Sequence, residues 1–595
     1  MDPAQEYRQR LEDRRASHVR LVALDERLSH ARLAVFAAGA IVAWLAFRLG
    51  MVPAWWLGLV FAVFAWLITR HDSVIRRRDA AARAMAFYER GLARIEDRWI
   101  GGGEAGERFR DDEHLYANDL DLFGSGSLFQ LLSIARTRAG EETLAGWLKA
   151  AASSEVIRAR QKATDEMMPR LDLRESLALA GTDVRAGVNP ALLVEWATAP
   201  TLGSRWAWAT ATLLTIGAVG AVIYWISTRR IEAIVVVAVL EVLWSIPRRK
   251  RLEQVLHAAD QAARDLDILA HVLEHLERER FESPRLSELR AALDRDGITA
   301  SRAIRHLHYL AEMHDWQHNQ FFAPLAAFVL WGTHIAHAME HWRGRYGSQV
   351  AGWLAIVGEF EAFSSLSAYR FEHPGDVSPE IVDVGPAIFE GGALGHPLLP
   401  AARMIPNDVS LSGDTRLLVV SGSNMSGKST LLRTVGINAV MALAGASVRA
   451  SRLRLTPVAV GATLRIQDSL QEGRSRFFAE ITRIRDLADV AAGPVPLLFL
   501  LDELFHGTNS HDRLVGSTGV LRGLLDRGAI GLITTHDLAL TKAADDLAPR
   551  AINVHFADTF EGGEIQFDYR MKPGPVTRSN AIALMRAVGL DVDAP

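Results

Sequence analysis

The chain has 595 residues, too many for one hydrophobic core, so two to four domains are expected. Apolar residues make up 49% of the sequence and the net charge is −4, which excludes a largely disordered chain and a uniformly basic, DNA-coating protein. The absence of cysteine excludes disulfides, thiolate metal sites and cysteine nucleophiles.

The N-terminal part joins a charged segment to an apolar one. Residues 1–32 are dense in Arg and Glu and predict a charged helix, not a cleaved signal peptide. Residues 33–69 carry a single charge, Arg48, and Pro53 divides them, which predicts a first transmembrane hairpin. We interpret residues 70–114 as a connecting helix.

A second apolar zone follows a segment, residues 115–200, that we interpret as the first part of a helical core. Residues 206–247 predict a second transmembrane hairpin, turning at Arg229 and Arg230. The limb over residues 231–247 contains two glutamates and is the weakest of four expected spans, because a carboxylate inside a bilayer is costly. The alternative is that these apolar helices are buried in a large soluble core.

Basic residues flank both hairpins and predict their orientation. Arg32 and Arg70 border the first hairpin, and Arg248 begins a basic run after the second. The positive-inside rule then places the ends of both hairpins in the cytoplasm, although Arg229 and Arg230 oppose it mildly. We therefore expect a multi-pass protein of the inner (cytoplasmic) membrane with its C-terminal part in the cytoplasm.

Residues 251–385 alternate apolar and charged positions at helical spacing and predict the second part of the helical core, including a lever. The apolar run over residues 321–335 contains Pro324 and His334. We interpret this run as a buried helix, with a membrane segment as the alternative.

From residue 386 to 595, short β-branched runs alternate with helical patterns, which predicts an α/β domain. The expected strands of a largely parallel sheet cover residues 416–421, 458–462, 496–501 and 529–534.

A glycine-rich segment after the first of these strands predicts a phosphate-binding loop that opens a helix. Backbone N–H groups and the helix dipole favour phosphate there. Lys428 is expected to reach the β and γ phosphates and to be catalytic, and Ser429 to bind Mg²⁺. The predicted nucleotide-binding residues are Gly422, Ser423, Asn424, Met425, Ser426, Gly427, Lys428, Ser429 and Thr430.

Acidic and imidazole side chains follow two later strands. Asp502 and Glu503 end the strand over 496–501; we predict that Asp502 binds Mg²⁺ and that Glu503 is the general base. His536 follows the strand over 529–534 and is predicted to contact the γ-phosphate or the attacking water.

These motifs resemble the ATPase domain of the MutS mismatch-repair family. The resemblance rests on the Asn-Met pair within residues 421–430, on residues 507–512 after the acidic strand, and on the signature segment 473–480. It implies ATP and Mg²⁺ as ligands, a homodimer through the ATPase domains, and Ser475 reaching the nucleotide of the opposite subunit. It also implies DNA as a partner, with Arg302, Arg305, Arg483 and Arg485 as candidate phosphate contacts.

Weaker resemblances in residues 120–148 and 358–366 extend to the helical core of the same family. Three departures are Arg476, where the family usually has Thr, Phe505-His506 in place of Gly-Arg, and residues 1–114, which leave no room for a mismatch-reading domain. The expected protein is thus multidomain: a MutS-like α-helical core with two transmembrane hairpins, then an α/β P-loop NTPase domain of the ABC/MutS type. The alternative to a DNA-binding ATPase is a membrane-side, ATP-driven machine or scaffold that does not bind DNA.

Overall fold

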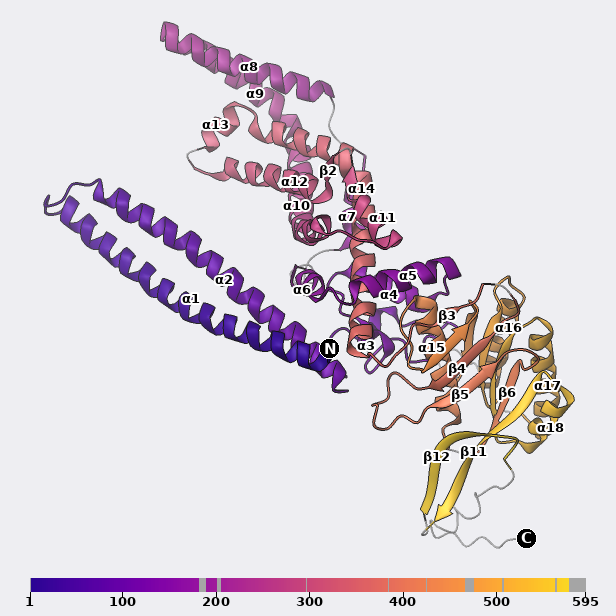
Figure 1. The fold of residues 1–595 in the computed structure, drawn as a ribbon. Coiled ribbons are helices and arrows are strands. Elements are labelled where there is room, and N and C mark those ends of the chain that lie inside the picture. Colours follow the sequence, from indigo (N-terminus) through magenta and orange to yellow (C-terminus); the bar gives the residue numbers. More distant parts are fainter. Residues whose placement is uncertain are drawn as a thin grey trace. The chain divides into compact units, whose positions relative to one another are not determined.

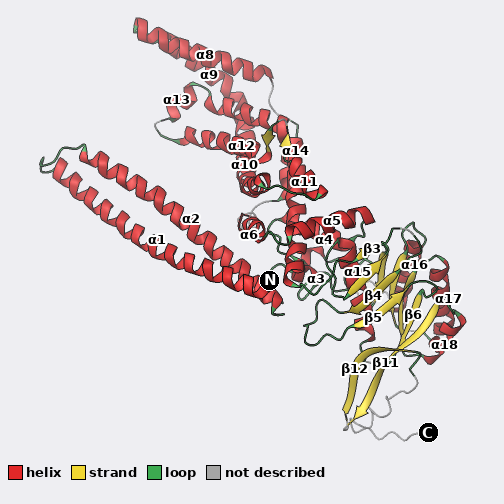
Figure 2. Cartoon of the chain, viewed as in Figure 1, coloured by secondary structure: helices red, strands yellow, loops and turns green. Residues whose placement is uncertain are grey.

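The computed structural model describes residues 2–180, 189–200, 205–295, 297–320, 322–383, 385–423, 425–465, 476–505, 508–561 and 564–576. It is mostly helical up to residue 372 and has two β-sheets beyond it (Figures 1 and 2). The chain forms two compact units, residues 1–102 with 371–374, and residues 103–370 with 375–595.

The first unit is built on two long antiparallel helices, α1 (Pro3–Phe47) and α2 (Trp56–Ile95) (Figure 1). Helix α1 begins at Pro3 because Asp2 accepts a hydrogen bond from the Ala4 N–H at 3.2 Å and proline favours the first turn. Near this end the Tyr7 ring packs against Gly91, where a Cβ atom would lie 2.4 Å from the ring. The two helices therefore approach closely at the end that carries the N-terminus.

A polar cluster joins the two helices farther along. His71 Nε2 lies 2.5 Å from Asp25 Oδ1, and Arg32 Nη1 lies 2.8 Å from His71 Nδ1. Because an arginine can only donate, His71 Nδ1 is the acceptor and His71 Nε2 carries the proton that is donated to Asp25. Arg78 Nη1 completes the cluster at 2.6 Å from Asp25 Oδ2. These four side chains satisfy one another's charges where the charged half of the hairpin meets the apolar half.

The apolar half of this hairpin has its large side chains exposed. They include Leu33, Phe36, Ile41, Trp44, Phe47, Phe61 and Trp66. The alternative of a buried soluble core is therefore not supported for these helices within the described residues. The helix predicted over residues 70–114 is instead the second half of α2, which ends at Ile95, and the short 3-10 helix η1 (Glu107–Phe109) lies beyond it.

The second unit begins with a helical core whose centre is formed by α10, α12 and α14. Leu266 and Leu273 of α10 pack with Ile304 of α12 and with Trp342 and Phe360 of α14. The elements of this core, apart from the apolar pair described next, are α3 (Leu128–Leu132), α4 (Arg138–Lys149), α5 (Ser154–Met167), α6 (Leu171–Ala180), α7 (Pro190–Thr198), α10 (Arg249–Arg278), α11 (Pro284–Ala291), β1 (Asp294–Arg295), β2 (Ile298–Thr299), α12 (Ala300–Asp315), η4 (Trp316–His318), α13 (Ala323–Phe328) and α14 (Trp331–Glu372).

The second apolar hairpin consists of α8 (Arg205–Thr228) and α9 (Glu232–Ser245), which pack against each other. Trp244 Nε1 donates to Thr210 Oγ1 at 3.1 Å, so the end of α9 lies beside the beginning of α8 and the pair is antiparallel. Figure 1 shows α8 and α9 running together away from the rest of this unit.

Three helices of the described chain are long and apolar enough to cross a membrane: α1, α2 and α8. Of the four predicted spans, these three meet the length and composition of a membrane crossing, and the fourth, over residues 231–247, does not. Helix α9 has 14 residues, about 21 Å of helix, which is short of a hydrocarbon core of about 30 Å. It ends where Pro247 enters the 3-10 helix η3 (Ile246–Arg248).

The prediction of one buried helix over residues 321–335 is also wrong. The chain forms α13, breaks at Leu330, whose φ of 48° is left-handed, and starts α14 at Trp331. Leu325 is 54% exposed, so α13 is not a core helix. Backbone reversal at a single leucine leaves no signal in the hydropathy of the run.

The C-terminal part of the second unit is α/β, as predicted (Figure 2). A four-stranded sheet has the order β3-β7-β4-β5, and a six-stranded sheet has the order β12-β11-β6-β10-β9-β8. The strands are β3 (Glu380–Ile381), β4 (Phe389–Leu394), β5 (Asn407–Leu411), β6 (Leu417–Ser421), β7 (Arg452–Leu455), β8 (Ala459–Thr463), β9 (Leu497–Asp502), β10 (Ile530–Thr535), β11 (Ala551–Glu561) and β12 (Glu564–Pro573). The four predicted strands are β6, β8, β9 and β10, and they pair in parallel as expected.

Helices cover both faces of the six-stranded sheet. Helix α15 (Lys428–Ala444) packs on one face, where Gly436 leaves room for Leu500 of β9. The other face packs against α16 (Arg476–Ala491), α17 (Ser510–Asp526) and α18 (Leu538–Asp546) through a shared apolar cluster. The sheet is thus buried on both sides, and its polar groups are confined to the ends of the strands.

Candidate active site

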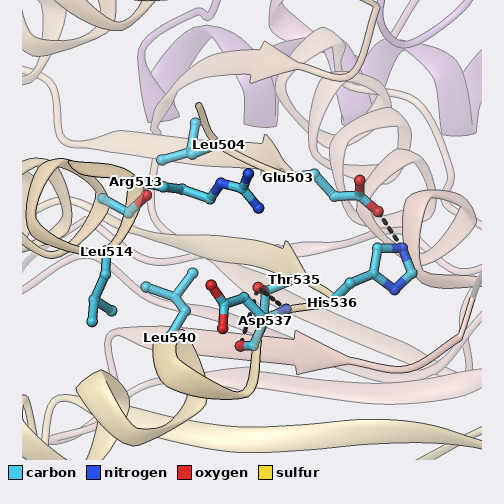
Figure 3. Close-up of a pocket in the computed structure, with 9 residues that line it drawn as sticks. Glu503, Leu504, Arg513, Leu514, Thr535, His536, Asp537 and Leu540 are labelled. Atoms are coloured by element: carbon cyan, nitrogen blue, oxygen red, sulfur yellow. Dashed lines mark hydrogen bonds and ion pairs between the residues drawn. The ribbon is translucent and has the colours of Figure 1, made fainter. Parts of the chain in front are cut away.

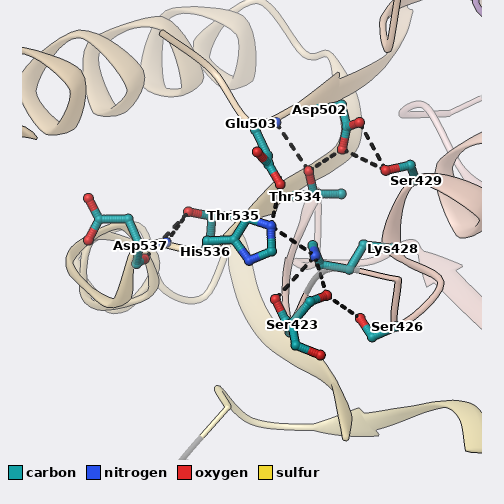
Figure 4. A network of polar contacts seen from close by, with 11 residues as sticks. Ser423, Ser426, Lys428, Ser429, Asp502, Glu503, Thr534, Thr535, His536 and Asp537 are labelled. Atoms are coloured by element: carbon teal, nitrogen blue, oxygen red, sulfur yellow. Dashed lines mark hydrogen bonds and ion pairs between the residues drawn. The ribbon is translucent and has the colours of Figure 1, made fainter. Parts of the chain in front are cut away.

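Three adjacent strands bring the predicted residues to one edge of the sheet. Strand β10 lies between β6 and β9, with Thr535 level with Ser421 and Thr534 level with Asp502. Because the strands are parallel, the segments that follow them emerge side by side, which is where α/β folds bind ligands. The phosphate loop, the acidic pair and His536 therefore meet at this edge (Figure 4).

The loop between β6 and α15 curls through left-handed backbone. The φ angles are 153° at Gly422, 66° at Met425 and 103° at Gly427. A Cβ atom at Gly422 would lie 2.9 Å from Ser426 Oγ and 3.0 Å from the carbonyl oxygen of Phe556, so only glycine fits. The loop leads directly into the N-terminus of α15, the geometry that suits a phosphate.

Lys428, the first residue of α15, folds its side chain back over this loop. Its Nζ donates to the carbonyl oxygens of Ser423 at 2.7 Å and Gly422 at 3.1 Å, and lies 3.3 Å from His536 Nε2. Burial lowers the pKa of the Lys428 ammonium, and the carboxylates of Glu503 and Asp502 oppose that change. The ammonium is thus positioned between the loop and the acidic strand end.

Asp502 and Ser429 form a pair of oxygen ligands beside the loop. Ser429 Oγ lies 2.9 Å from Asp502 Oδ2 and 3.2 Å from Oδ1, and Thr534 Oγ1 donates to Asp502 Oδ1 at 2.5 Å. A hydroxyl and a carboxylate next to a phosphate site are hard oxygen donors of the kind that Mg²⁺ prefers. The residues present therefore fit Mg²⁺, which Ser429 and Asp502 could hold.

Glu503 is held in strained backbone next to His536. Its φ of 49° is left-handed, which is uncommon for a residue other than glycine and recurs at functional sites. The Glu503 N–H donates to Thr534 Oγ1 at 3.1 Å, and Glu503 Oε1 lies 2.5 Å from His536 Nε2. The strained turn therefore directs the carboxylate at the imidazole that follows the neighbouring strand.

A small cavity of about 30 Å³ opens beside Glu503 and His536 (Figure 3). Arg513 of α17 and Asp537 also line it. This volume holds about one or two water molecules. Arg513 was not predicted from the sequence to line this site. Its position in the first turn of the helix after the acidic strand could have indicated it.

A larger cavity of about 430 Å³ adjoins the phosphate loop at Gly427 and Thr430. Its other walls include His396, Ile405 and Tyr569, none of which the sequence singled out. His396 is buried, and burial lowers its pKa to about 4, so the imidazole is neutral at pH 7. A neutral, partly apolar cavity of this size suits the base and ribose of a nucleotide whose phosphates lie on the loop.

The other predicted residues fall outside this constellation or outside the described residues. Asn424 and Ser475 lie outside the described residues. The side chain of Met425 is 85% exposed, and Ser426 Oγ donates to the Ser423 carbonyl oxygen at 2.8 Å, which stabilises the loop from within. Thr430 is exposed at the mouth of the larger cavity.

Among the basic residues suggested as DNA contacts, Arg483 serves the fold, whereas Arg302, Arg305 and Arg485 are exposed. Arg483 donates to the carbonyl oxygens of Asp112, Glu113 and His114, so it holds the segment before the helical core against α16. Arg485 pairs with Asp486 at 2.8 Å and Arg305 with Glu274 at 3.3 Å. Arg483 therefore has a role in the fold, because both of its terminal nitrogens donate to backbone oxygens, and a contact with DNA stays a prediction.

Four features together define a P-loop nucleotide-binding domain. They are a buried parallel sheet, a glycine-rich loop that opens a helix, a lysine whose side chain folds back over that loop, and acidic residues at the end of a strand. Comparison with known families gives the particular class: residues 418–593 match MutS domain V. The chain therefore carries the ATPase domain of the MutS family.

Two relatives agree with this assignment. Over 245 residues, 40% of this chain, it is 33% identical to a DNA mismatch repair protein MutS 2 of Halobacterium salinarum, of which 27% is covered. Over 202 residues, 33% of this chain, it is 34% identical to a DNA mismatch repair protein MutS of Lactobacillus delbrueckii subsp. bulgaricus, of which 23% is covered. The chain thus spans about a quarter of the length of the curated relatives it matches.

Proposed function

We propose that this protein is a Mg²⁺-dependent ATPase that is anchored in a membrane and works as a homodimer. The observation that carries the proposal is the convergence of Lys428, Ser429, Asp502, Glu503 and His536 on one sheet edge, where contacts of 3.3 Å or less, two of them through Thr534, link them in series. The match to MutS domain V supports ATP as the nucleotide.

The residues divide the hydrolysis reaction among them. The loop N–H groups and Lys428 bind the β and γ phosphates and stabilise the charge that develops there. Glu503 accepts a proton from a water as that water's oxygen attacks the γ-phosphorus and the bond to the bridging oxygen of ADP breaks. His536, 2.5 Å from Glu503, positions the carboxylate. Mg²⁺ held by Ser429 and Asp502 would neutralise phosphate charge.

The membrane part of the proposal rests on exposed apolar helices. Helices α1, α2 and α8 meet the length and composition of membrane spans. Because α8 and α9 are antiparallel, the chain returns to the side from which α8 started even though α9 is short. With Arg32, Arg70 and Arg248 at the bases of the hairpins, we place these bases and the ATPase domain in the cytoplasm.

The relatives' names make DNA the first candidate for the regulating partner, and dimerisation would bring Ser475 of one subunit to the nucleotide of the other. A second function, a membrane-side machine that does not bind DNA, is favoured by one observation. Arg483, Arg485 and Arg305 are engaged within the chain and the net charge is −4. The charges of these three candidates are therefore partly compensated within the chain, which weakens their attraction for phosphates.

The test is ATP turnover by the detergent-solubilised full chain, alone and with homoduplex, mismatched or branched DNA. Glu503→Gln serves as the blank because it retains the shape of the site and removes the base. Stimulation by one DNA form supports the DNA-processing ATPase. A rate that no DNA changes supports the membrane-side machine, and turnover by Glu503→Gln equal to wild type contradicts the assigned base. Extraction of membranes with carbonate tests anchoring separately, because release of the protein contradicts it.

A further inference from the structure

A cavity of about 690 Å³ lies where the second apolar hairpin joins the helical core. The first turns of α8, the end of α9, the start of α10 and one face of α14 enclose it. Three indoles and three guanidinium groups line it: Trp206, Trp208, Trp244, Arg248, Arg249 and Arg251. Such a combination of aromatic and cationic side chains is typical of a site for an amphiphilic anion.

The cavity lies at the boundary between an apolar and a cationic surface. On one side, α8 and α9 present exposed apolar residues such as Leu213, Ile216 and Val239. On the other side, the basic run that starts at Arg248 opens α10. Indoles gather at the level of lipid headgroups in membrane proteins, and the pairing of Trp244 with Thr210 holds both helices at this level.

The charge inside the cavity is positive. Arg248 stacks over the Trp244 ring at 4.6 Å and donates to the Trp244 carbonyl oxygen through Nη1, and it lines the cavity. Arg249 pairs with Glu253 at 2.9 Å, whereas Arg251 has no acidic partner within 4 Å among the described residues. The one carboxylate on the wall, Glu340, is paired with Arg343 at 2.8 Å.

Two stacked aromatic rings, an indole and an imidazole, form another part of the cavity lining. The Trp208 ring stacks on the His337 ring of α14 with centroids 4.8 Å apart, and this pair closes the side of the cavity that faces the helical core. The cavity therefore has a cationic and aromatic lining, and the two helices α8 and α9 that supply part of it carry exposed apolar side chains.

We propose that this cavity binds the headgroup of an anionic membrane phospholipid. The lipid phosphate lies against Arg248 and Arg251, and the acyl chains follow the exposed apolar side chains of α8 and α9. Basic pockets at the cytoplasmic end of membrane helices bind anionic headgroups in this way, because arginines near the surface attract them. The inference rests on the proposed membrane anchoring and adds the class of lipid and its site.

The experiment is a native mass-spectrometric titration of the full chain, purified in detergent and freed of lipid, with phosphatidylglycerol or with phosphatidylcholine of the same acyl chains. Wild type is expected to bind phosphatidylglycerol about tenfold more tightly than phosphatidylcholine. The double variant Arg248→Gln/Arg251→Gln is expected to lose this preference, to within about twofold, because two charges are removed. The double variant Arg76→Gln/Arg77→Gln is the matched control, since both arginines are exposed next to the first hairpin, and it should keep the preference.

Several outcomes overturn the proposal. They are an equal affinity of wild type for the two lipids, an equal loss of preference in the Arg76/Arg77 variant, and displacement of phosphatidylglycerol by millimolar inorganic phosphate, which indicates a site for free phosphate. If the Arg248/Arg251 variant does not fold, wild type and Trp208→Phe are compared for fluorescence quenching by brominated phosphatidylglycerol and brominated phosphatidylcholine. Quenching of Trp208 that is no stronger with the anionic lipid contradicts the site.

The proposed function and this inference fail separately. Release of the protein by carbonate contradicts membrane anchoring, whatever the lipid titration gives. Retention in the membrane together with no preference for the anionic lipid contradicts only the lipid site. ATP binding by each variant, measured in the same detergent, reports whether the P-loop domain has folded.

Discussion

Buried polar groups are arranged in opposite ways at the nucleotide site and in the apolar helices. At the sheet edge, Asp502 accepts hydrogen bonds from Ser429 and Thr534, so one carboxylate has partners from two other segments. In the second hairpin, Thr215 Oγ1 contacts one other side chain, His334, besides backbone carbonyl oxygens, and Glu241 Oε1 has no hydrogen-bond partner among the described residues. A dense network indicates a site built for charged ligands, whereas isolated polar groups indicate helices selected for an apolar surrounding.

Removal of the Lys428 side chain should have the largest effect on the nucleotide site. Lys428→Ala should lower ATP turnover about 10³-fold, or about 4 kcal/mol in the activation free energy, because a preorganised cation aimed at the phosphates is lost. Steady-state phosphate release measures this. Lys542→Ala, an exposed lysine of α18, is the control and should stay near wild type. Equal rates for Lys428→Ala and Lys542→Ala would mean that the dense network is not the catalytic site.

Protonation of His396 should have the next largest effect, on stability. Its pKa is about 4 in the folded protein because of burial, below the ordinary 6.5, so the stabilisation is complete above pH 6.5 and is lost as the pH falls toward 4. The full loss corresponds to about 3 kcal/mol in the free energy of unfolding. Urea titrations at pH 7.5, 6 and 5 should show a steeper decline for wild type than for His396→Asn. Parallel declines in the two proteins would contradict the depressed pKa.

Ser429 tests whether the oxygen pair is a metal site. Ser429→Ala should raise the Mg²⁺ concentration for half-maximal turnover about tenfold, equivalent to about 1.4 kcal/mol, because one of two protein ligands is removed. A Mg²⁺ titration of ATPase activity measures the change. Ser410→Ala removes an exposed hydroxyl of β5 as the control. An unchanged Mg²⁺ requirement in Ser429→Ala would exclude Ser429 as a ligand.

Thr215 tests how much a polar contact contributes to the stability of the apolar helices. Thr215→Val removes the contact with His334 Nε2 at 3.0 Å and the hydrogen bond to the Val329 carbonyl oxygen at 3.1 Å. The expected loss of stability is only about 0.6 kcal/mol, since side-chain hydrogen bonds made by helices in an apolar surrounding are weak on average. Unfolding in mixed detergent micelles gives the difference from Thr212→Val, whose hydroxyl bonds only to its own helix. A loss above about 2 kcal/mol would indicate that the pair belongs to a larger network.

The site was predictable because parallel strands bring distant residues to one edge. The residues after β6, β9 and β10 could be assigned to one location once the strands were recognised, and the structure places Lys428, Asp502 and His536 together. His396 and Tyr569 could not be assigned, since they reach the cavity of about 430 Å³ from segments far apart in the sequence, after β4 and in β12, with no motif to mark them.

In the helical part, the sequence predicted which segments are apolar but not where each helix begins and ends. Hydropathy identified the apolar runs, but it did not show that a helix ends before Pro247 or that Leu330 adopts a left-handed conformation. Arg483 illustrates the same limit for charge, because an arginine that caps backbone carbonyl oxygens has the same sequence signal as one that faces DNA. The proposed boundaries between the helical core and the ATPase domain stay predictions.

The first hairpin is long enough to separate the charges at its two ends electrostatically. Its charged part in α1, Pro3 to Arg32, is about 45 Å long at 1.5 Å per residue, several times the Debye length of about 8 Å in physiological salt. With the apolar half in a bilayer, the surface potential of the lipids is screened out long before the far end, where Arg94 and Glu372 form a buried ion pair. Charges at that end are thus free of the membrane's field, and only arginines near Arg32 and Arg70 can influence how the hairpin inserts.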